Sequence, residues 1–278
     1  MSLANVTGFV RPADLGEAFA AVQHGAIPVS GGTAVILHTP SIPSTLVDLT
    51  GLPLSGISAS EGAFAIGATT TLSEMLEHPG LAAHADGVIA EMLAMVGSPL
   101  LRNRATIGGH LGRGRLSDVI PVLLALDATV SWYDGEERDE PLAAFYAAGI
   151  HRTPMIITGV AIPALHRPAA AAFRKFSRTH FDLAILNCAC RVSLADDGTV
   201  HAARVVVGET PELGASVNDA EAMLRGRPFD PSAIAAAATI AATEIPARTD
   251  DRASAEYRRA LAAVLVRRCL ADIASRLP

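Results

Sequence analysis

A glycine pair between a polar segment and a long apolar run is the feature that most constrains this chain. Residues 102–130 read RNRATIGGHLGRGRLSDVIPVLLALDATV, so Gly108 and Gly109 directly follow Thr106 and Ile107. Glycine has no Cβ, and its backbone amide can therefore come close to an anion. The stretch is typical of a turn that binds phosphate.

A second glycine pair occurs near the N-terminus, in IPVSGGTAVIL at 27–37. Pro28 and Val29 are expected to end a short strand there, and another apolar run follows the turn. A diphosphate needs two such turns, so the two pairs support each other. A tight hairpin uses the same residues for conformational reasons, and this is the commoner explanation of one pair alone.

The common nucleotide-binding motifs do not occur. No GxGxxG follows a strand and no GxxxxGK[ST] is found in the chain, which argues against a Rossmann or P-loop protein. None of the nine histidines has HxxxH or HExxH spacing, so metal binding through histidine has little support. No pairing of a nucleophile with a base stands out either, and the sequence predicts no catalytic residue.

Length and composition indicate a folded protein of up to two domains. The 278 residues are 50% hydrophobic and 18% charged, which excludes a disordered chain. No run reaches the ~18 uninterrupted apolar residues that a membrane span requires. The N-terminus lacks the pattern of a signal peptide, so a cytoplasmic protein is expected. The net charge of −6 argues against general nucleic-acid binding.

The chain has three cysteines, Cys188, Cys190 and Cys269. The first two are two residues apart in an alternating apolar stretch, so we expect them on the same face of a strand. A four-cysteine iron-sulfur cluster cannot be built from three. We interpret all three as reduced packing residues, because free cysteine behaves as a small hydrophobe.

Hydrophobic periodicity predicts alternating helices and strands before a linker, and a hairpin and helices after it. Residues 163–172, with two prolines and few large apolar groups, are the best linker candidate. The predicted helices before it are 14–24, 72–78, 87–96 and 119–128, and the predicted strands are 27–29, 45–49, 63–68, 129–133 and 156–162. After it, 181–194 and 200–207 are predicted to form a hairpin around Asp196-Asp197-Gly198, and a long helix is predicted at 254–277.

The long final helix is predicted to have one apolar and one basic face. The basic face is interpreted as solvated or as a partner surface, since the chain is acidic overall. The apolar face comprises Tyr257, Leu261, Val264, Leu265, Ile273 and Leu277, and the basic residues are Arg258, Arg259, Arg267, Arg268 and Arg276.

Several motifs in order along the chain resemble the flavin-binding medium subunits of molybdenum hydroxylases. This group includes aerobic carbon monoxide dehydrogenase and xanthine dehydrogenase, and the match runs almost from end to end. The motifs are SGGTAVI at 30–36, LVDL at 46–49, IGATTTLSEML at 66–76, VGSPLLRNRATIGGHL at 96–111, DVIPVLLALDATV at 118–130, KFSRTHFDLAIL at 175–186 and SAEYRRALAAVLVRRCL at 254–270.

The resemblance implies an α+β flavoprotein with FAD as its cofactor. It implies a two-subdomain FAD-binding domain of the vanillyl-alcohol-oxidase type at 1–165, with subdomains of about 1–53 and 54–165. A smaller C-terminal α+β domain with a short antiparallel sheet would follow at 166–278. The expected partners are a large molybdenum-cofactor subunit and a small [2Fe-2S] subunit, and the expected electron acceptor is NAD+, a quinone or oxygen.

The resemblance also assigns binding residues. The two glycine turns would cradle the pyrophosphate and ribityl parts of FAD, through backbone amides and through the hydroxyls of Ser30, Thr33 and Thr106. The residues of these turns are Ser30, Gly31, Gly32, Thr33 and Ala34, and Thr106, Ile107, Gly108, Gly109 and His110. His110 stands where the family more often has serine or asparagine.

Asp118, Lys175 and Arg178 match further family residues near the flavin. Asp118 would accept a hydrogen bond from a ribose or ribityl hydroxyl, or else cap the helix that begins at Val119. Lys175 and Arg178 would stabilise negative charge on reduced flavin, or else form an ordinary exposed strand entry.

One segment departs from the family pattern. Where the family commonly reads AHADPAAD, this chain reads GRGRLSD at 112–118, with two added arginines. Two alternatives to an electron-transfer subunit therefore stay open. One is a self-contained FAD oxidoreductase of the same fold, and the other is an assembly subunit that has lost FAD.

Overall fold

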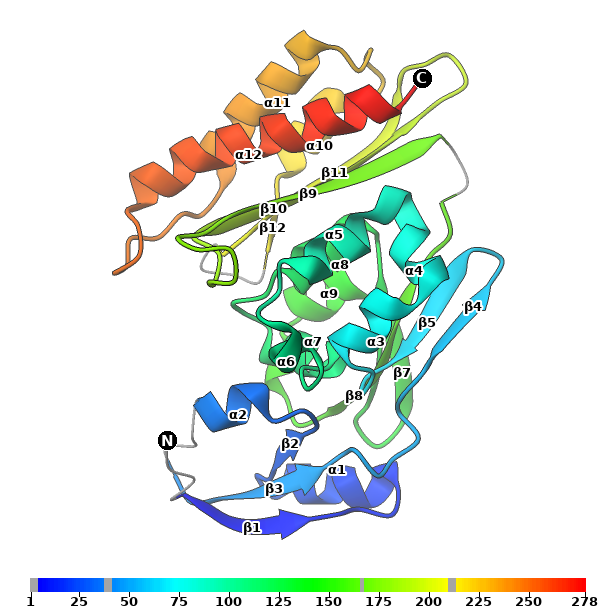
Figure 1. Cartoon of the computed structure of the whole chain (residues 1–278), viewed down its shortest axis with the longest axis vertical. Helices are drawn as coiled ribbons and strands as arrows, with labels where there is room; N and C mark the ends of the chain where they lie inside the picture. The colour runs from blue at the N-terminus through cyan, green and yellow to red at the C-terminus, as the bar shows by residue number, and fades with distance from the viewer. Residues whose placement is uncertain (1–4, 38–41, 166–167, 210–213) are drawn as a thin grey trace. The chain divides into compact units, whose positions relative to one another are not determined.

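The computed structural model describes residues 5–37, 42–165, 168–209 and 214–278 (Figure 1). Within these ranges the chain forms two compact units that are interleaved along the sequence. Unit 1 comprises residues 1–78, 98–114 and 127–162, and unit 2 comprises residues 79–97, 115–126 and 163–278. Part of the polypeptide between the glycine turns therefore folds with the C-terminal half of the chain.

Unit 1 begins with a small parallel sheet of order β1-β3-β2. Helix α1 (Leu15–Gln23) connects β1 to β2 and buries Phe19, whose ring meets that of Tyr133 edge-on with centroids 5.7 Å apart. The side chain of Asp14 accepts a hydrogen bond from the amide of Glu17 and so caps α1. The three strands are β1 (Val6–Val10), β2 (Ile27–Val29) and β3 (Ser44–Asp48).

A second sheet in unit 1 is antiparallel and has the order β4-β5-β8-β6-β7. One face is buried, because alternate residues such as Ile66, Val130 and Val160 are large and apolar. Helix α7 (Ile107–Arg113) packs against β8. The strands are β4 (Ile57–Ser60), β5 (Ala63–Gly67), β6 (Thr129–Tyr133), β7 (Glu137–Pro141) and β8 (Ile156–Ile162). The other helices of the unit are α2 (Thr33–Leu37), α3 (Leu72–Glu77), α6 (Pro99–Arg102), α9 (Leu142–Ala147) and the 3-10 helix η2 (Ile150–Arg152).

Unit 2 has an antiparallel sheet of order β12-β11-β10-β9. Helices α11 and α12 lie together, and α12 runs along β9 and β10 (Figure 1). Helix α8 packs against β10 and β11, and α5 packs against β9. The strands are β9 (Ala169–Phe176), β10 (Leu186–Leu194), β11 (Val200–Gly208) and β12 (Ala215–Ser216). The helices are α4 (Pro79–Ala83), η1 (His84–Gly87), α5 (Val88–Ala94), α8 (Val119–Ala125), α10 (Asn218–Leu224), α11 (Pro231–Glu244) and α12 (Ala255–Arg276).

The predicted α+β fold with a C-terminal antiparallel sheet is confirmed, and so is the hairpin of β10 and β11. The predicted linker is wrong at its end, because residues 169–172 are the first part of β9 and are largely buried. Residues 166 and 167 of that linker lie outside the described residues. The strand predicted from 181 begins at Leu186 instead, since the carbonyl oxygens of Leu183 and Ala184 accept hydrogen bonds from the Arg252 side chain and not from a neighbouring strand.

The basic face predicted for the final helix is wrong at Arg258. This side chain is 1% exposed, whereas Tyr257, predicted to be apolar and buried, is 46% exposed. Arg258 donates to both carboxylate oxygens of Asp250, at 2.9 and 3.0 Å, and to the carbonyl oxygens of three residues, Ile185, Arg248 and Ala253. Burial by itself raises the pKa of Asp250, but hydrogen bonds from Arg258 and Arg248 lower it well below its ordinary value.

Replacing Arg258 by alanine should therefore destabilise unit 2. The substitution leaves Asp250 and three carbonyl oxygens without their donor, and losing one partner of a buried ion pair costs about 3–5 kcal/mol of unfolding free energy. Urea unfolding followed by circular dichroism measures the change. Arg259→Ala, at the exposed neighbouring position, is the matched control and should change the unfolding free energy by less than about 0.5 kcal/mol.

Candidate functional site

The first glycine turn lies in unit 1, between β2 and α2. Gly32 has a φ of +73°, a left-handed conformation that glycine adopts without strain. Thr33 and Ala34 form the first turn of α2, where backbone amides have no acceptor inside the helix. The start of α2 therefore has backbone amides without an acceptor inside the helix, and their binding of a phosphate together with the hydroxyls of Ser30 and Thr33 stays a prediction.

The second glycine pair lies in the first turn of α7, not in a loop. The Thr106 side chain caps this helix by accepting a hydrogen bond from the amide of Gly109, at 3.3 Å. The amides of Ile107 and Gly108 donate to the carbonyl oxygens of Thr70 and Ala68, at 3.0 and 2.8 Å. Gly108 is required for this close approach, because a Cβ there would lie 2.7 Å from the Cβ of Ala68.

In this structure the amides of the second pair donate hydrogen bonds within the protein, and the expectation that they bind phosphate stays a prediction. The amides of Ile107, Gly108 and Gly109 are bound as described above, and that of His110 donates to the carbonyl oxygen of Thr106 at 3.1 Å. Backbone amides already used by the protein cannot also serve an anion at full strength. Thr106 is 4% exposed, and its hydroxyl accepts from the Gly109 amide, so the proton of this hydroxyl is not used by that bond.

The first turn contacts Arg104, in the segment that leads into the second turn, within unit 1. A Cβ on Gly31 would lie 1.6 Å from the carbonyl oxygen of Arg104, so any larger residue would force the two backbones apart. The Arg104 side chain in turn donates to the carbonyl oxygen of Gly31, at 3.4 Å. The structure thus brings together two segments that are more than seventy residues apart, as a diphosphate site requires.

His110 is uncharged at neutral pH. Burial lowers the pKa of its imidazole to about 4, and the positive charge of Arg113 contributes to the shift. The residue therefore adds a neutral polar ring, and no positive charge, beside the second pair. The GRGRLSD segment continues from here: Gly114 ends α7 with a φ of +66°, and Leu116 has a φ of +51°.

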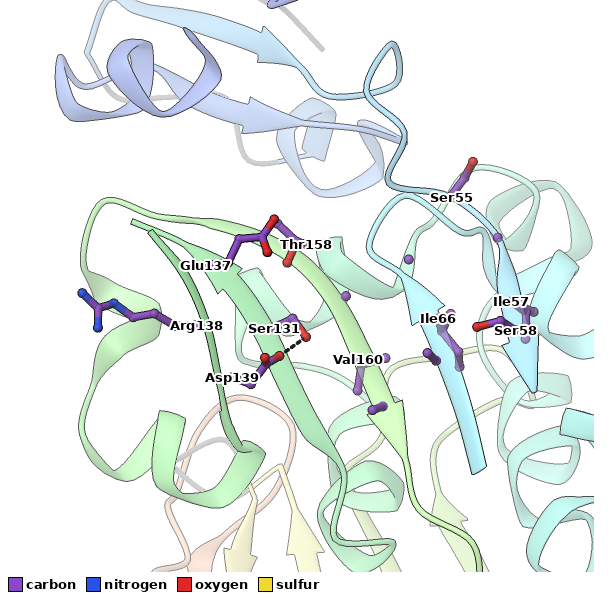
Figure 2. A pocket seen from close by; sticks show the side chains of 15 residues that line it. Ser55, Ile57, Ser58, Ile66, Ser131, Glu137, Arg138, Asp139, Thr158 and Val160 are labelled. Atoms are coloured by element: carbon purple, nitrogen blue, oxygen red, sulfur yellow. Dashed lines mark hydrogen bonds between the residues drawn. The ribbon is translucent and has the colours of Figure 1, made fainter. Parts of the chain in front are cut away.

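A separate hollow of about 560 Å³ lies on the five-stranded sheet of unit 1 (Figure 2). Its floor is made of small residues such as Gly67, Gly159 and Ser131. Ser131 donates a hydrogen bond to Asp139, which stands near Glu137 at one side of the hollow. The predicted binding residues do not line it, so it is distinct from the glycine turns.

Asp118 and Lys175 meet in unit 2. The Lys175 Nζ donates to Asp118 Oδ2 at 2.7 Å and to the carbonyl oxygen of Met95 at 2.9 Å, and its side chain is only 3% exposed. The other oxygen of Asp118 accepts a hydrogen bond from Asn187 Nδ2 at 2.7 Å. The alternative of an exposed strand entry is therefore wrong for Lys175. The capping alternative for Asp118 is wrong too, since its side chain makes no cap hydrogen bond and Ser117 Oγ accepts from the amide of Val119.

Register explains why these groups converge. Lys175, Asn187 and Gly208 lie opposite one another on β9, β10 and β11, and alternate residues of a strand share a face. A Cβ on Gly208 would lie 1.9 Å from Asn187 Oδ1 and 2.6 Å from Pro121 of α8. Because Gly208 has no side chain, α8 can pack close to this part of the sheet. Asp118, directly before α8, can then reach Lys175 and Asn187. Roles of Asp118, Lys175 and Arg178 toward a flavin stay predictions.

Arg178 behaves differently from Lys175. Its side chain is 65% exposed and pairs with Asp182 at 2.8 Å. Desolvation is slight at this position, so the pair contributes little to stability. Lys175 is thus a buried cation and Arg178 an exposed one, although the sequence motif groups them together.

Glu209 is a buried ionisable residue that the sequence reasoning missed. It is 6% exposed and has a φ of +61°, which is rare outside glycine, asparagine and aspartate. Burial raises the pKa of its carboxyl to about 7, and the negative charge of Asp118 adds to the shift. A glutamate directly after a strand carries no signal of burial, since glutamate is mostly exposed in folded proteins.

Two sequence families match the chain. A family described as the FAD binding domain in molybdopterin dehydrogenase matches residues 4–165, and a family described as the CO dehydrogenase flavoprotein C-terminal domain matches residues 171–273. The 6-hydroxypseudooxynicotine dehydrogenase complex subunit alpha of Paenarthrobacter nicotinovorans is 33% identical over 83% of this chain and 80% of its own length. The carbon monoxide dehydrogenase medium chain of Hydrogenophaga pseudoflava is 26% identical over 82% of this chain and 81% of its own.

Solved structures agree with these matches. A chain of carbon monoxide dehydrogenase from Hydrogenophaga pseudoflava superposes with a TM-score of 0.89 and 26% identity, over 98% of this chain and 99% of that one. A chain of quinoline 2-oxidoreductase from Pseudomonas putida 86 gives a TM-score of 0.85 with 26% identity, over 99% of each chain. Separately, none of the helices in the described ranges is long and apolar enough to cross a membrane.

Glu209 should make the stability of unit 2 depend on pH. Its folded-state pKa of about 7 lies above the ordinary 4.5, so the folded state retains the proton more tightly. The contribution of Glu209 to stability is fully present below pH 4.5 and is lost as the pH rises through 7. The unfolding free energy falls by about 3 kcal/mol over this range. Between pH 4.5 and 8 the unfolding free energy of the wild type should fall by that amount relative to Glu209→Gln, as measured by urea unfolding.

The matched control is Glu256→Gln, at an exposed position in the first turn of α12. It should leave the pH dependence of the wild type unchanged. Parallel stability curves for the wild type and Glu209→Gln between pH 4.5 and 8 would contradict the expectation.

Proposed function

The chain belongs to the family of FAD-binding medium subunits of molybdenum hydroxylases, and we propose that it is the subunit through which electrons leave such a complex. FAD is its cofactor, and it is an oxidoreductase component. In this proposal a large molybdenum-cofactor subunit oxidises the substrate and a small [2Fe-2S] subunit relays the electrons. The flavin of this chain then passes them to NAD+, a quinone or oxygen.

Relatives of this chain support the proposed partners. They include components of dehydrogenases for 6-hydroxypseudooxynicotine and carbon monoxide, and one is described as a subunit of a complex. The three cysteines are all buried in unit 2, and a [2Fe-2S] cluster takes four protein ligands. Iron-sulfur clusters of the proposed relay therefore belong to another chain.

The carrying observation is the contact between Gly31 of the first glycine turn and Arg104, two residues before the second turn, in unit 1. Their residues fit a diphosphate, because Gly31 lets the turns approach while the first turn keeps its amides and hydroxyls available. Ser30, Gly31, Gly32, Thr33 and Ala34 would hold the pyrophosphate, with Thr106 adding a hydroxyl from the start of α7. His110 stays neutral there and lets the amides and hydroxyls carry the recognition.

Bound FAD supplies a group that accepts two electrons and gives them up singly or together. The protein's part is to hold the dinucleotide in one place. Gly31 does this by allowing the first turn to approach Arg104, Gly108 by allowing α7 to approach Ala68, and the Thr106 cap by fixing the first turn of α7.

Gly31→Ala should abolish tight FAD binding. The added Cβ would lie 1.6 Å from the Arg104 carbonyl oxygen, so the turns must separate. We expect at least a 100-fold rise in the dissociation constant for FAD, measured by the flavin absorption retained after excess cofactor is removed and by calorimetry.

Gly51→Ala is the matched control, because a Cβ at Gly51 meets nothing within 4 Å and the residue has an ordinary φ. Thr33→Val tests the site without moving the backbone, and loss of one hydroxyl should weaken FAD binding about fivefold. If Gly31→Ala still folds and retains flavin like the wild type, the glycine turns do not form the site.

The route of the electrons is tested on the FAD-loaded chain. Flavin reduced with dithionite should be reoxidised rapidly by one of NAD+, a soluble quinone or oxygen, and stopped-flow absorption measures the three rates. Catalytic turnover of a substrate by the chain alone would favour the self-contained oxidoreductase. A chain that stays colourless with excess FAD but binds large and small subunits would favour an assembly role.

A further inference from the structure

The three cysteines of the chain come together in the core of unit 2. Cys188 and Cys190 lie on one face of β10, and α12 packs on this face with Cys269 turned toward them. The Sγ atoms of Cys188 and Cys190 are 3.6 Å apart, and all three Sγ atoms lie within 4.8 Å of one another. Each side chain is 0% exposed.

These distances fit a metal ion bound by three sulfur atoms. A metal–sulfur bond of about 2.3 Å places three ligands in a plane around the ion about 4.0 Å apart. The Cys188–Cys190 separation is 3.6 Å and the other two are within 4.8 Å, so small movements of the three side chains would complete the site. The ligands come from two elements distant in the sequence, so an ion here would tie β10 to α12.

A disulfide between Cys188 and Cys190 is a poor alternative. Residues two apart on a strand have Cβ atoms about 6.6 Å apart, whereas a disulfide needs about 3.8 Å. Sulfur atoms that lean together from such positions can share an ion without bending the strand.

Charge and ligand number decide which ion fits. Among the described residues, no fourth cysteine, histidine or carboxylate joins the cluster, whereas zinc in structural sites takes four ligands. Burial raises the pKa of the Cys190 and Cys269 thiols well above the ordinary value, so each thiolate formed is costly. A monovalent soft ion needs the fewest thiolates, and Cu(I) is the ion of this kind that sulfur ligands select.

We propose that Cys188, Cys190 and Cys269 form a binding site for one Cu(I) ion in the core of unit 2. Two thiols lose their protons to solvent when Cu(I) binds, and the third sulfur coordinates as a neutral thiol, which leaves the site with one negative charge. Arg174, directly opposite Cys188 on β9, interacts electrostatically with Cys188 and Cys269 and also pairs with Glu91 and Asp272 at 2.8 and 2.7 Å, so it offsets part of that charge.

The test uses the full-length chain, reduced and free of oxygen, with three thiols per chain confirmed by titration in denaturant. Cu(I) is added against the competing chelator bathocuproine disulfonate, with incubation long enough for a closed core to open. We expect one ion per chain, ultraviolet thiolate-to-copper absorption and a higher melting temperature. X-ray absorption at the copper edge should show three sulfur neighbours at about 2.3 Å.

Cys269→Ala should lower the affinity for Cu(I) at least 100-fold, and Cys190→Ala should do the same. Ala189→Ser, at a neighbouring buried position on the opposite face of β10, is the control and should bind one ion. Copper that is absent from the wild type, or bound through nitrogen and oxygen neighbours, would overturn the proposal. The absorption measurement needs no variant, so it decides the matter even if a variant fails to fold.

Discussion

The contact between Gly31 and the carbonyl oxygen of Arg104 is the constraint on which the rest of unit 1 depends. It brings the first glycine turn against the segment that leads into the second, although the two are far apart in the sequence. Each turn is also held by the secondary structure beside it. The first follows β2, and the second is bound to residues 68–72 by backbone hydrogen bonds. Rigid neighbours of this kind hold a ligand-binding turn in the conformation that the ligand needs, so less entropy is lost on binding.

Unit 2 depends on a different kind of constraint, the placement of buried charge. Lys175 is held by Asp118 and the Met95 carbonyl, and Arg258 is held by Asp250 and three carbonyl oxygens. Burying a charge is costly unless hydrogen bonds replace the lost water. At both sites the buried cation lies on a strand or a helix and donates hydrogen bonds to acceptors in loops. These hydrogen bonds fix the conformation of the loops. Gly208 contributes to this arrangement, because the absence of a side chain leaves room for α8.

Particular residues mark the limit of prediction from sequence. The glycine pairs were recognised, but the second pair was expected in a loop and instead begins α7, because Thr106 caps a helix that glycine propensity disfavours. Lys175 and Arg178 look alike in the sequence, yet one is buried and the other exposed. Residues 169–172 resemble a linker, and tertiary packing makes them the buried first part of β9. The Thr106 cap is a local contact, whereas for Lys175 and for residues 169–172 a non-local contact outweighed the local preference.

By itself, the sequence determined the family, the cofactor, the order of most helices and strands and the two glycine turns. These follow from short-range patterns, since periodicity and motif spacing are properties of neighbouring residues. Only the tertiary structure decided which amides are already used, which charges are buried and which distant side chains meet. The Gly31–Arg104 contact, the row of Lys175, Asn187 and Gly208, and the three converging cysteines all depend on strand register and helix packing, which no local segment encodes.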